Sequence, residues 1–167
     1  LGNDVLQIVG SGNATIDVSK GNDTVTTGSG NDTITMKGVG GTVLSAQTIN
    51  GGAGNDTFTL EGAVSSVIRG NEGRDNFNLS GNYTSVTVNG NSGEDTFTGD
   101  NSVALSNAKI IGGNDNDGGI NLGNIVSAVD SAGNLHAANL IIWDSLCAYN
   151  LISTIDSNYR NSGATSL

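Results

Sequence analysis

Proline is absent from this sequence of 167 residues, and cysteine, histidine and tryptophan occur once each. A single cysteine, Cys147, excludes an intrachain disulfide. Aromatic residues make up only 4% of the chain, which is too little for a compact core built around large rings. Lys and Arg together number 6 against 16 acidic residues, so no basic patch is available to neutralise phosphates. We therefore expect no binding to nucleic acid.

Long apolar runs are also missing. No stretch of about 18 apolar residues could span a bilayer, so no membrane insertion is expected. No secretory leader is recognisable at the first residues. The chain starts with Leu1 inside a repeat unit, which predicts that it is a piece of a longer protein or a processed product.

Glycine and aspartate are abundant instead. The chain holds 26 glycines and carries a formal charge of −10, mostly from aspartate. The aspartates recur in glycine-rich turns at two rhythms. Asp4, Asp23 and Asp32 belong to units nine or ten residues apart, with Ala14 in one aspartate position. Asp56, Asp75 and Asp95 follow at steps of 19 and 20 residues, and a degenerate copy ends at Asp117.

One geometry explains both rhythms. Two units make a coil of 18 to 20 residues with a strand on each side and a turn at each end. Residues 1–119 are thus predicted to be all-β, a parallel β-roll or β-helix (a β-solenoid) of about six coils. In the later coils one aspartate turn becomes a looser loop, at residues 37–44, 61–64, 80–83 and 99–105.

The strands alternate polar and apolar residues, which directs every second side chain inward. Phe58, Phe77 and Phe97 each lie two residues after an aspartate, so we expect them to stack as a ladder inside the solenoid.

Residues 120–167 break the pattern and hold a more apolar sequence. Ile125–Trp143 is compatible with a hairpin, and Asp144–Ile155 with a short helix capped by Asp144. The open end of a solenoid exposes apolar side chains and strand edges. We therefore predict that this segment is a cap or an assembly contact with neighbouring subunits or further domains of the same chain.

The clearest unit is Gly51-Gly52-Ala53-Gly54-Asn55-Asp56-Thr57-Phe58-Thr59. It resembles the repeats-in-toxin (RTX) nonapeptide G-G-x-G-x-D-x-U-x at every defined position, and the resemblance extends in weaker copies over residues 1–117. It implies a β-roll whose turns bind Ca²⁺ through aspartate carboxylates and turn carbonyls. The candidate metal-binding residues are Asp4, Asp23, Gly28, Gly30, Asp32, Gly51, Gly52, Gly54, Asp56, Asp75, Asp95 and Asp117.

The chemistry agrees with this resemblance. Ca²⁺ takes six to eight oxygen ligands in irregular geometry, and glycine allows a tight turn that aims its carbonyls at an ion. The alternative is that the turns are structural only, with Asp and Asn forming local hydrogen bonds. Ala14 predicts a missing ligand in its own turn.

The later turns depart from the nonapeptide. In-register coils would place Arg74 beside Glu94, about 5 Å apart at the backbone. An ion pair there could replace a metal ion. We therefore predict that Asp75 and Asp95 bind calcium weakly or not at all.

No catalytic constellation is visible. His136 and Cys147 are isolated in the sequence, and the repeat already explains the carboxylates. The leading hypothesis is a non-enzymatic, calcium-stabilised structural or adhesive module of an extracellular protein: a cell-surface or S-layer protein, an adhesin, or a virion fibre or decoration protein. The alternatives are a calcium-binding accessory region of a secreted enzyme or toxin, and a secretion-signal region.

Overall fold

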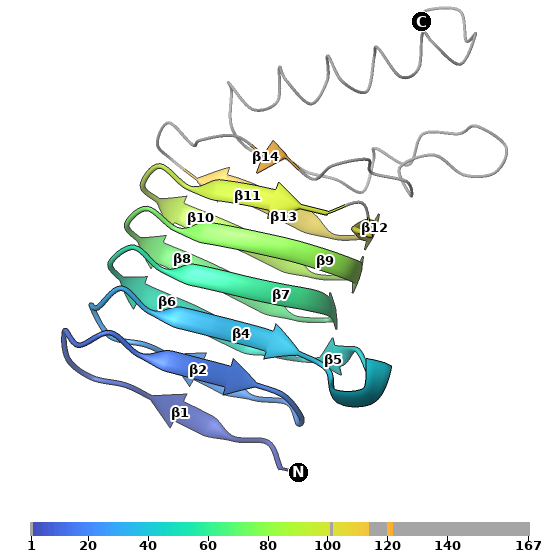
Figure 1. The fold of residues 1–167 in the computed structure, drawn as a ribbon, viewed down its shortest axis with the longest axis horizontal. Helices are drawn as coiled ribbons and strands as arrows, with labels where there is room; N and C mark the ends of the chain where they lie inside the picture. Colours follow the sequence, from blue (N-terminus) through green and yellow to red (C-terminus); the bar gives the residue numbers. More distant parts are fainter. Residues whose placement is uncertain (1, 101, 114–119, 122–167) are drawn as a thin grey trace, which may run out of the picture.

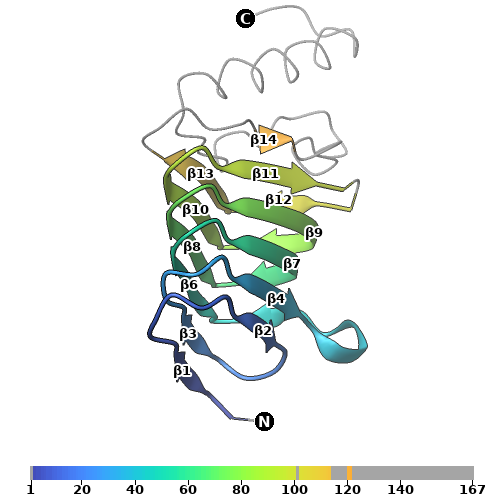
Figure 2. The ribbon, with the colours of Figure 1, turned by 60° about the vertical axis from the view of Figure 1, so that its left-hand side comes forward.

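The computed structural model describes residues 2–100, 102–113 and 120–121. These residues form a right-angled stack of short strands in two parallel sheets that face each other (Figures 1 and 2). Sheet A contains, in spatial order, β1 (Val5–Gln7), β3 (Thr24–Thr26), β6 (Thr48–Ala53), β8 (Val67–Glu72), β10 (Thr87–Ser92) and β13 (Lys109–Gly113). Sheet B contains β2 (Thr15–Val18), β4 (Thr33–Lys37), β7 (Thr57–Val64), β9 (Asn76–Thr84), β11 (Thr96–Gly99) and β14 (Ile120–Asn121).

The chain passes alternately from one sheet to the other, so each strand pairs in parallel with the strand one coil away. β4 pairs with β7 so that Ile34 faces Phe58, and β7 pairs with β9 so that Phe58 faces Phe77. The predicted parallel β-solenoid is therefore confirmed. It has about five coils in the described residues, and β14 pairs with β11 as the start of the next.

Two coils are longer than the predicted 18 to 20 residues. The backbone of Asp32 and the side chain of Asp56 occupy equivalent places at a step of 24 residues, and Ser85 and Asn107 at a step of 22. The first excess lies between β4 and β6, where the 3₁₀ turn η1 (Val39–Gly41) and the short strand β5 (Leu44–Ser45) bulge from the stack (Figure 1).

Two of the predicted loops are strand instead. Residues 61–64 belong to β7 and residues 80–83 to β9, with a bulge in the pairing between Glu61 and Ala63. Strands β5 and β12 (Ala104–Ser106) extend this part of sheet B by pairing with the ends of β7 and β9. Tyr83 is buried there and its hydroxyl donates to the carbonyl of Leu60 at 2.7 Å. A buried hydroxyl with a carbonyl partner keeps the strand continuous where a loop was expected.

The predicted aromatic ladder is confirmed. The rings of Phe58 and Phe77 stack with centroids 4.5 Å apart, and those of Phe77 and Phe97 with centroids 4.6 Å apart. The same inward file begins with Ile16 and Ile34. A second inward file faces it from sheet A and contains Val25, Ile49, Ile68, Val88 and Ile110. The core is thus a narrow column of one side chain per strand from each wall, continued by shorter files such as Met36, Leu60 and Leu79.

The first coil has no neighbour below it. Leu6 lies in register with the buried Val25 and yet is 41% exposed, because β1 is the edge of sheet A. No helix in the described part of the chain has the length and apolar character needed to cross a membrane. The segment predicted to form a cap lies, beyond β14, outside the described residues.

Replacing Phe77 with Ala tests the aromatic ladder. Because Phe77 is stacked on both faces and fully buried, we expect Phe77→Ala to lower the free energy of unfolding by about 3–5 kcal/mol. Denaturant unfolding in the presence of calcium measures it. Phe77→Leu, which keeps most of the volume, should cost clearly less. A loss below about 1 kcal/mol for the alanine variant would contradict this packing.

Candidate calcium-binding turns

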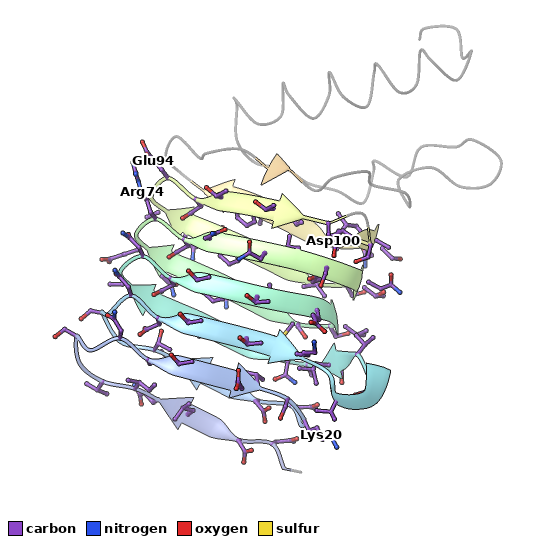
Figure 3. All side chains as sticks on the ribbon, in the orientation of Figure 1. Lys20, Arg74, Glu94 and Asp100 are labelled. Atoms are coloured by element: carbon purple, nitrogen blue, oxygen red, sulfur yellow. The ribbon has the colours of Figure 1, made fainter. Side chains whose placement is uncertain are left out.

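The coils turn at two opposite edges of the solenoid. The first corner comprises the turns that enter the strands of sheet B, and it carries the labelled residues Arg74 and Glu94 in Figure 3. The second corner comprises the turns that enter the strands of sheet A, on the side of the labelled Lys20. The residue just before each strand forms one stacked column at each corner. The first-corner column is Ala14, Asp32, Asp56, Asp75 and Asp95.

Successive turns of the first corner approach each other too closely for a side chain. A Cβ atom on Gly52 would lie 2.0 Å from the carbonyl oxygen of Gly28 in the preceding coil, and the φ of Gly52 is +94°. That carbonyl accepts a hydrogen bond of 2.9 Å from the backbone N–H of Ala53. Glycine is therefore required here both for the backbone conformation and for the close stacking of turns.

Each aspartate of the first corner binds the backbone of the coil before it. The N–H of Ala14 donates to Oδ1 of Asp32 at 2.7 Å, and the N–H of Asp32 donates to Oδ1 of Asp56 at 2.8 Å. The pattern repeats from Asp56 to Asp75 at 2.8 Å and from Asp75 to Asp95 at 2.9 Å. Each hydrogen bond satisfies a donor that the turn would otherwise leave buried.

The second carboxylate oxygen is not used in this way. Oδ2 of Asp32, of Asp56 and of Asp75 is buried without a hydrogen-bond partner. This oxygen lies above the glycine that opens its own turn, since a Cβ on Gly51 would come within 2.4 Å of Oδ2 of Asp56. A buried carboxylate oxygen without a donor is costly unless a proton or a cation compensates it.

Burial changes the acidity of two of these groups. Desolvation raises the pKa of Asp56 from 3.8 to about 7, and the N–H of Asp32 opposes this while the charges of Asp75 and Asp32 add to it. Desolvation also raises the pKa of Asp75, to about 6, against the N–H of Asp56. These sites therefore hold negative charge only at a cost, which is the condition under which a bound cation stabilises a fold most.

A second ladder runs beside the aspartates on the exposed side of the first corner. The N–H of Asn31 donates to Oδ1 of Asn13, and the N–H of Asn55 donates to Oδ1 of Asn31. The N–H of Arg74 continues the ladder to Oδ1 of Asn55. The asparagine side chains thus reach the following coil, whereas the aspartate side chains reach the preceding one, and adjacent residues tie each turn to both neighbours.

The predicted pairing of Arg74 with Glu94 is present, and Figure 3 shows both side chains at the outer edge of the stack. The two side chains are 65% and 50% exposed, so the ion pair contributes little to stability. It lies on the solvent side, while Oδ2 of Asp75 is buried without a partner. The ion pair therefore does not take over the place of a cation at Asp75, and weak calcium binding at Asp75 and Asp95 stays a prediction.

The second corner holds fewer carboxylates. Asp4 is exposed in the first coil, and its N–H donates to Oδ1 of the buried Asp23 at 2.9 Å. The next residues in this column are Gln47, Ser66, Val86 and Ala108. Counting aspartates did not reveal Gln47. The signal was its place directly before the strand that pairs with Thr24–Thr26.

The candidate residues thus fall into separate places. The first corner contains Gly28, Gly30, Asp32, Gly51, Gly52, Gly54, Asp56, Asp75 and Asp95; the second contains Asp4 and Asp23; and Asp117 lies outside the described residues. No three acidic, histidine or cysteine side chains of the described part converge on one point. A calcium site here would need one or two carboxylates completed by turn carbonyls. These oxygens and the uncompensated Oδ2 atoms fit Ca²⁺ by donor type.

Comparison with known proteins agrees with this geometry. The family model of the RTX calcium-binding nonapeptide repeat matches in four copies, over residues 8–35, 46–62 and 78–102. The solenoid of this chain belongs to the RTX nonapeptide-repeat family. The matched residues include the turns of Asp23, Asp32, Asp56 and Asp95, whereas Asp75 lies between matches. No curated protein and no solved structure matches the chain.

The acidity of the buried aspartates predicts the pH dependence of the calcium-free fold. Their pKa values are raised on folding, so the folded state binds more protons than the unfolded state between about pH 4 and pH 7. In chelator, the melting temperature of this RTX solenoid should therefore fall as the pH rises from 5 to 8. Asp56→Asn should flatten the profile. Asp17→Asn, which removes an exposed charge, should leave the slope nearly unchanged. Equal slopes in all three proteins would contradict the assignment.

Proposed function

We propose that this chain is a non-enzymatic, calcium-stabilised structural or adhesive module of an extracellular protein, such as a cell-surface layer, an adhesin or a virion fibre. The observation that carries the proposal is the column of buried carboxylates whose Oδ2 atoms have no protein donor at Asp32, Asp56 and Asp75. These lie in turns of a repeat family described as calcium-binding, and such repeats typically occur in secreted proteins.

The carboxylates of Asp32 and Asp56 and the carbonyls of their glycine turns would hold the ion. A bound Ca²⁺ supplies positive charge that offsets the repulsion and desolvation of stacked carboxylates. The aspartates themselves keep the coils in register through Oδ1. Because these sites are built from several coils, they exist only in the folded chain, and calcium binding is coupled to folding. Millimolar extracellular calcium suits such open sites.

The outer surfaces support a structural role. The outward residues of sheet B form two files across the coils, and nearly all are threonine or asparagine: Thr15, Thr33, Thr57, Asn76 and Thr96 in one, and Asp17, Thr35, Thr59, Asn78 and Thr98 in the other. Sheet A carries charged residues such as Arg69 and Lys109 on its outer side. A flat, neutral and regular face is suited to lateral packing of copies, because no like charges oppose contact.

Removal of calcium tests the coupling to folding. We expect the far-UV β-sheet signal of the full chain to weaken in EGTA and to return in millimolar Ca²⁺. With calcium at about 100 times its dissociation constant, one site adds about 2.7 kcal/mol to the free energy of unfolding. Circular dichroism and thermal unfolding measure both effects, and Mg²⁺ serves as the control because it demands a more regular oxygen shell. Identical spectra and melting temperatures with and without calcium would contradict the proposal.

The neutral face of sheet B is tested by charge. Thr35 and Thr59 are register partners on sheet B, and Thr24 and Thr48 are register partners on sheet A. We expect the calcium-loaded chain to self-associate with increasing concentration, and Thr35→Lys with Thr59→Lys to suppress this. Thr24→Lys with Thr48→Lys adds the same charge to the other face and should leave it intact. Sedimentation velocity measures the assembly state. Loss of assembly in both double variants, or a monomer throughout, would overturn this role of the face.

A further inference from the structure

Gln47 occupies the aspartate position of the second corner. It follows Asp23 in the column, because Thr24 pairs with Thr48, and it is only 1% exposed. Its own N–H donates to Oγ of Ser66 in the next coil at 3.1 Å. Gln47 therefore stands between the last carboxylate of this corner and a column that continues without any.

The amide of Gln47 is satisfied at both ends. Oε1 accepts a hydrogen bond of 3.1 Å from the N–H of Asp23, which repeats what an aspartate Oδ1 does at the first corner. Nε2 donates to the carbonyl of Gly21 at 2.6 Å and to the carbonyl of Ser45 at 3.0 Å. Because an N–H faces one end and two carbonyls face the other, the orientation of the amide is fixed by its partners.

The contrast with the first corner lies in the second atom of the side chain. At Asp32 and Asp56 this atom is an oxygen, Oδ2, which is buried without a donor. At Gln47 it is a nitrogen that carries two hydrogens to two carbonyl oxygens. One of these belongs to Gly21, in the glycine turn of Asp23. Turn carbonyls of this kind are the ligands that a calcium ion shares with the carboxylates.

We propose that Gln47 is an internal replacement for a calcium ion at the second corner. Its amide hydrogens take the position of positive charge next to the Gly21 carbonyl, and its Oε1 keeps the hydrogen bond that holds the coils in register. This inference rests on the proposed calcium binding at the first corner. It assigns calcium-independent stability to the second corner beyond Asp23 and confines the need for calcium after β3 to the first corner.

The rest of the column agrees with this division. Ser66 repeats the device on a smaller scale, since its hydroxyl accepts from Gln47 and donates to the carbonyl of Val64 at 2.9 Å. Val86 and Ala108 then close the column with buried apolar side chains. From Gln47 onward, no residue described in the second-corner column carries a charge that would need a cation.

The variant Gln47→Glu tests the replacement, because it changes the donor Nε2 into an oxygen at nearly constant shape. Without calcium, this oxygen would face the carbonyls of Gly21 and Ser45, so we expect a lower melting temperature than in the parent chain. With calcium, the new carboxylate and the Gly21 carbonyl would hold an ion. Isothermal titration calorimetry on the full chain should then count one more Ca²⁺ per chain, and the melting temperature should recover.

Two further variants make the result specific. Gln7→Glu introduces the same charge on the exposed strand β1 and should change neither the calcium count nor the melting temperature appreciably. Gln47→Leu removes the amide without offering a ligand and should lower the melting temperature both in EGTA and in calcium. If Gln47→Glu does not fold in EGTA, its refolding on addition of Ca²⁺ is the expected result.

The outcomes separate this inference from the proposed function. An unchanged calcium count in Gln47→Glu, together with equal destabilisation in EGTA and calcium, would overturn the replacement while calcium binding by the parent chain still stood. Failure of both Gln47→Glu and Gln47→Asp to fold even in calcium would overturn it as well. A parent chain that binds no Ca²⁺ would instead contradict the proposed function, and the replacement with it.

Discussion

The fold depends on the hydrogen bond between the backbone N–H of one turn and the side chain of the residue that stands in the same place one coil later. At the first corner the acceptor is an aspartate carboxylate in each coil from Asp32 to Asp95. This bond requires the coils to be in register, because a shift of one residue would move the carboxylate to the outside and the phenylalanine ladder with it. Register, turn and core are thus specified by the same two positions, the aspartate and the apolar residue two places later.

The same bond creates the requirement for a cation. A carboxylate has two oxygens, and the turn offers one donor, so the second oxygen remains inside the corner. Proteins rarely bury such an oxygen without compensation. The stacking therefore raises the pKa of Asp56 and Asp75 through desolvation and prepares a place for positive charge. In this view, register and calcium dependence are two results of one side chain.

Much of this could be predicted from the sequence. The alternation around Phe58 and Phe77, with glycine turns before them, predicts parallel strands with an inward ladder, because period and turn chemistry agree. The 24-residue coil could not be predicted from that pattern, since residues 38–43 carry no strand signal and the stack tolerates a bulge at an exposed edge. The continuous strands through residues 61–64 and 80–83 also depend on tertiary contacts, in particular the bond from Tyr83 to Leu60.

The candidate site shows the same division. Residue type and spacing identify Asp32 and Asp56 as metal ligands, but which carboxylate oxygen is left over is a property of the stacked coils. Arg74 and Glu94 are adjacent as their spacing predicts, yet their ion pair points to solvent and leaves the buried corner unchanged. A pair of charges predicted from register is therefore not evidence about the interior of a turn. That interior is decided by the atom next to the turn carbonyl. An aspartate places an oxygen there and makes the coil conditional on a cation, whereas Gln47 places a nitrogen there and leaves its corner complete.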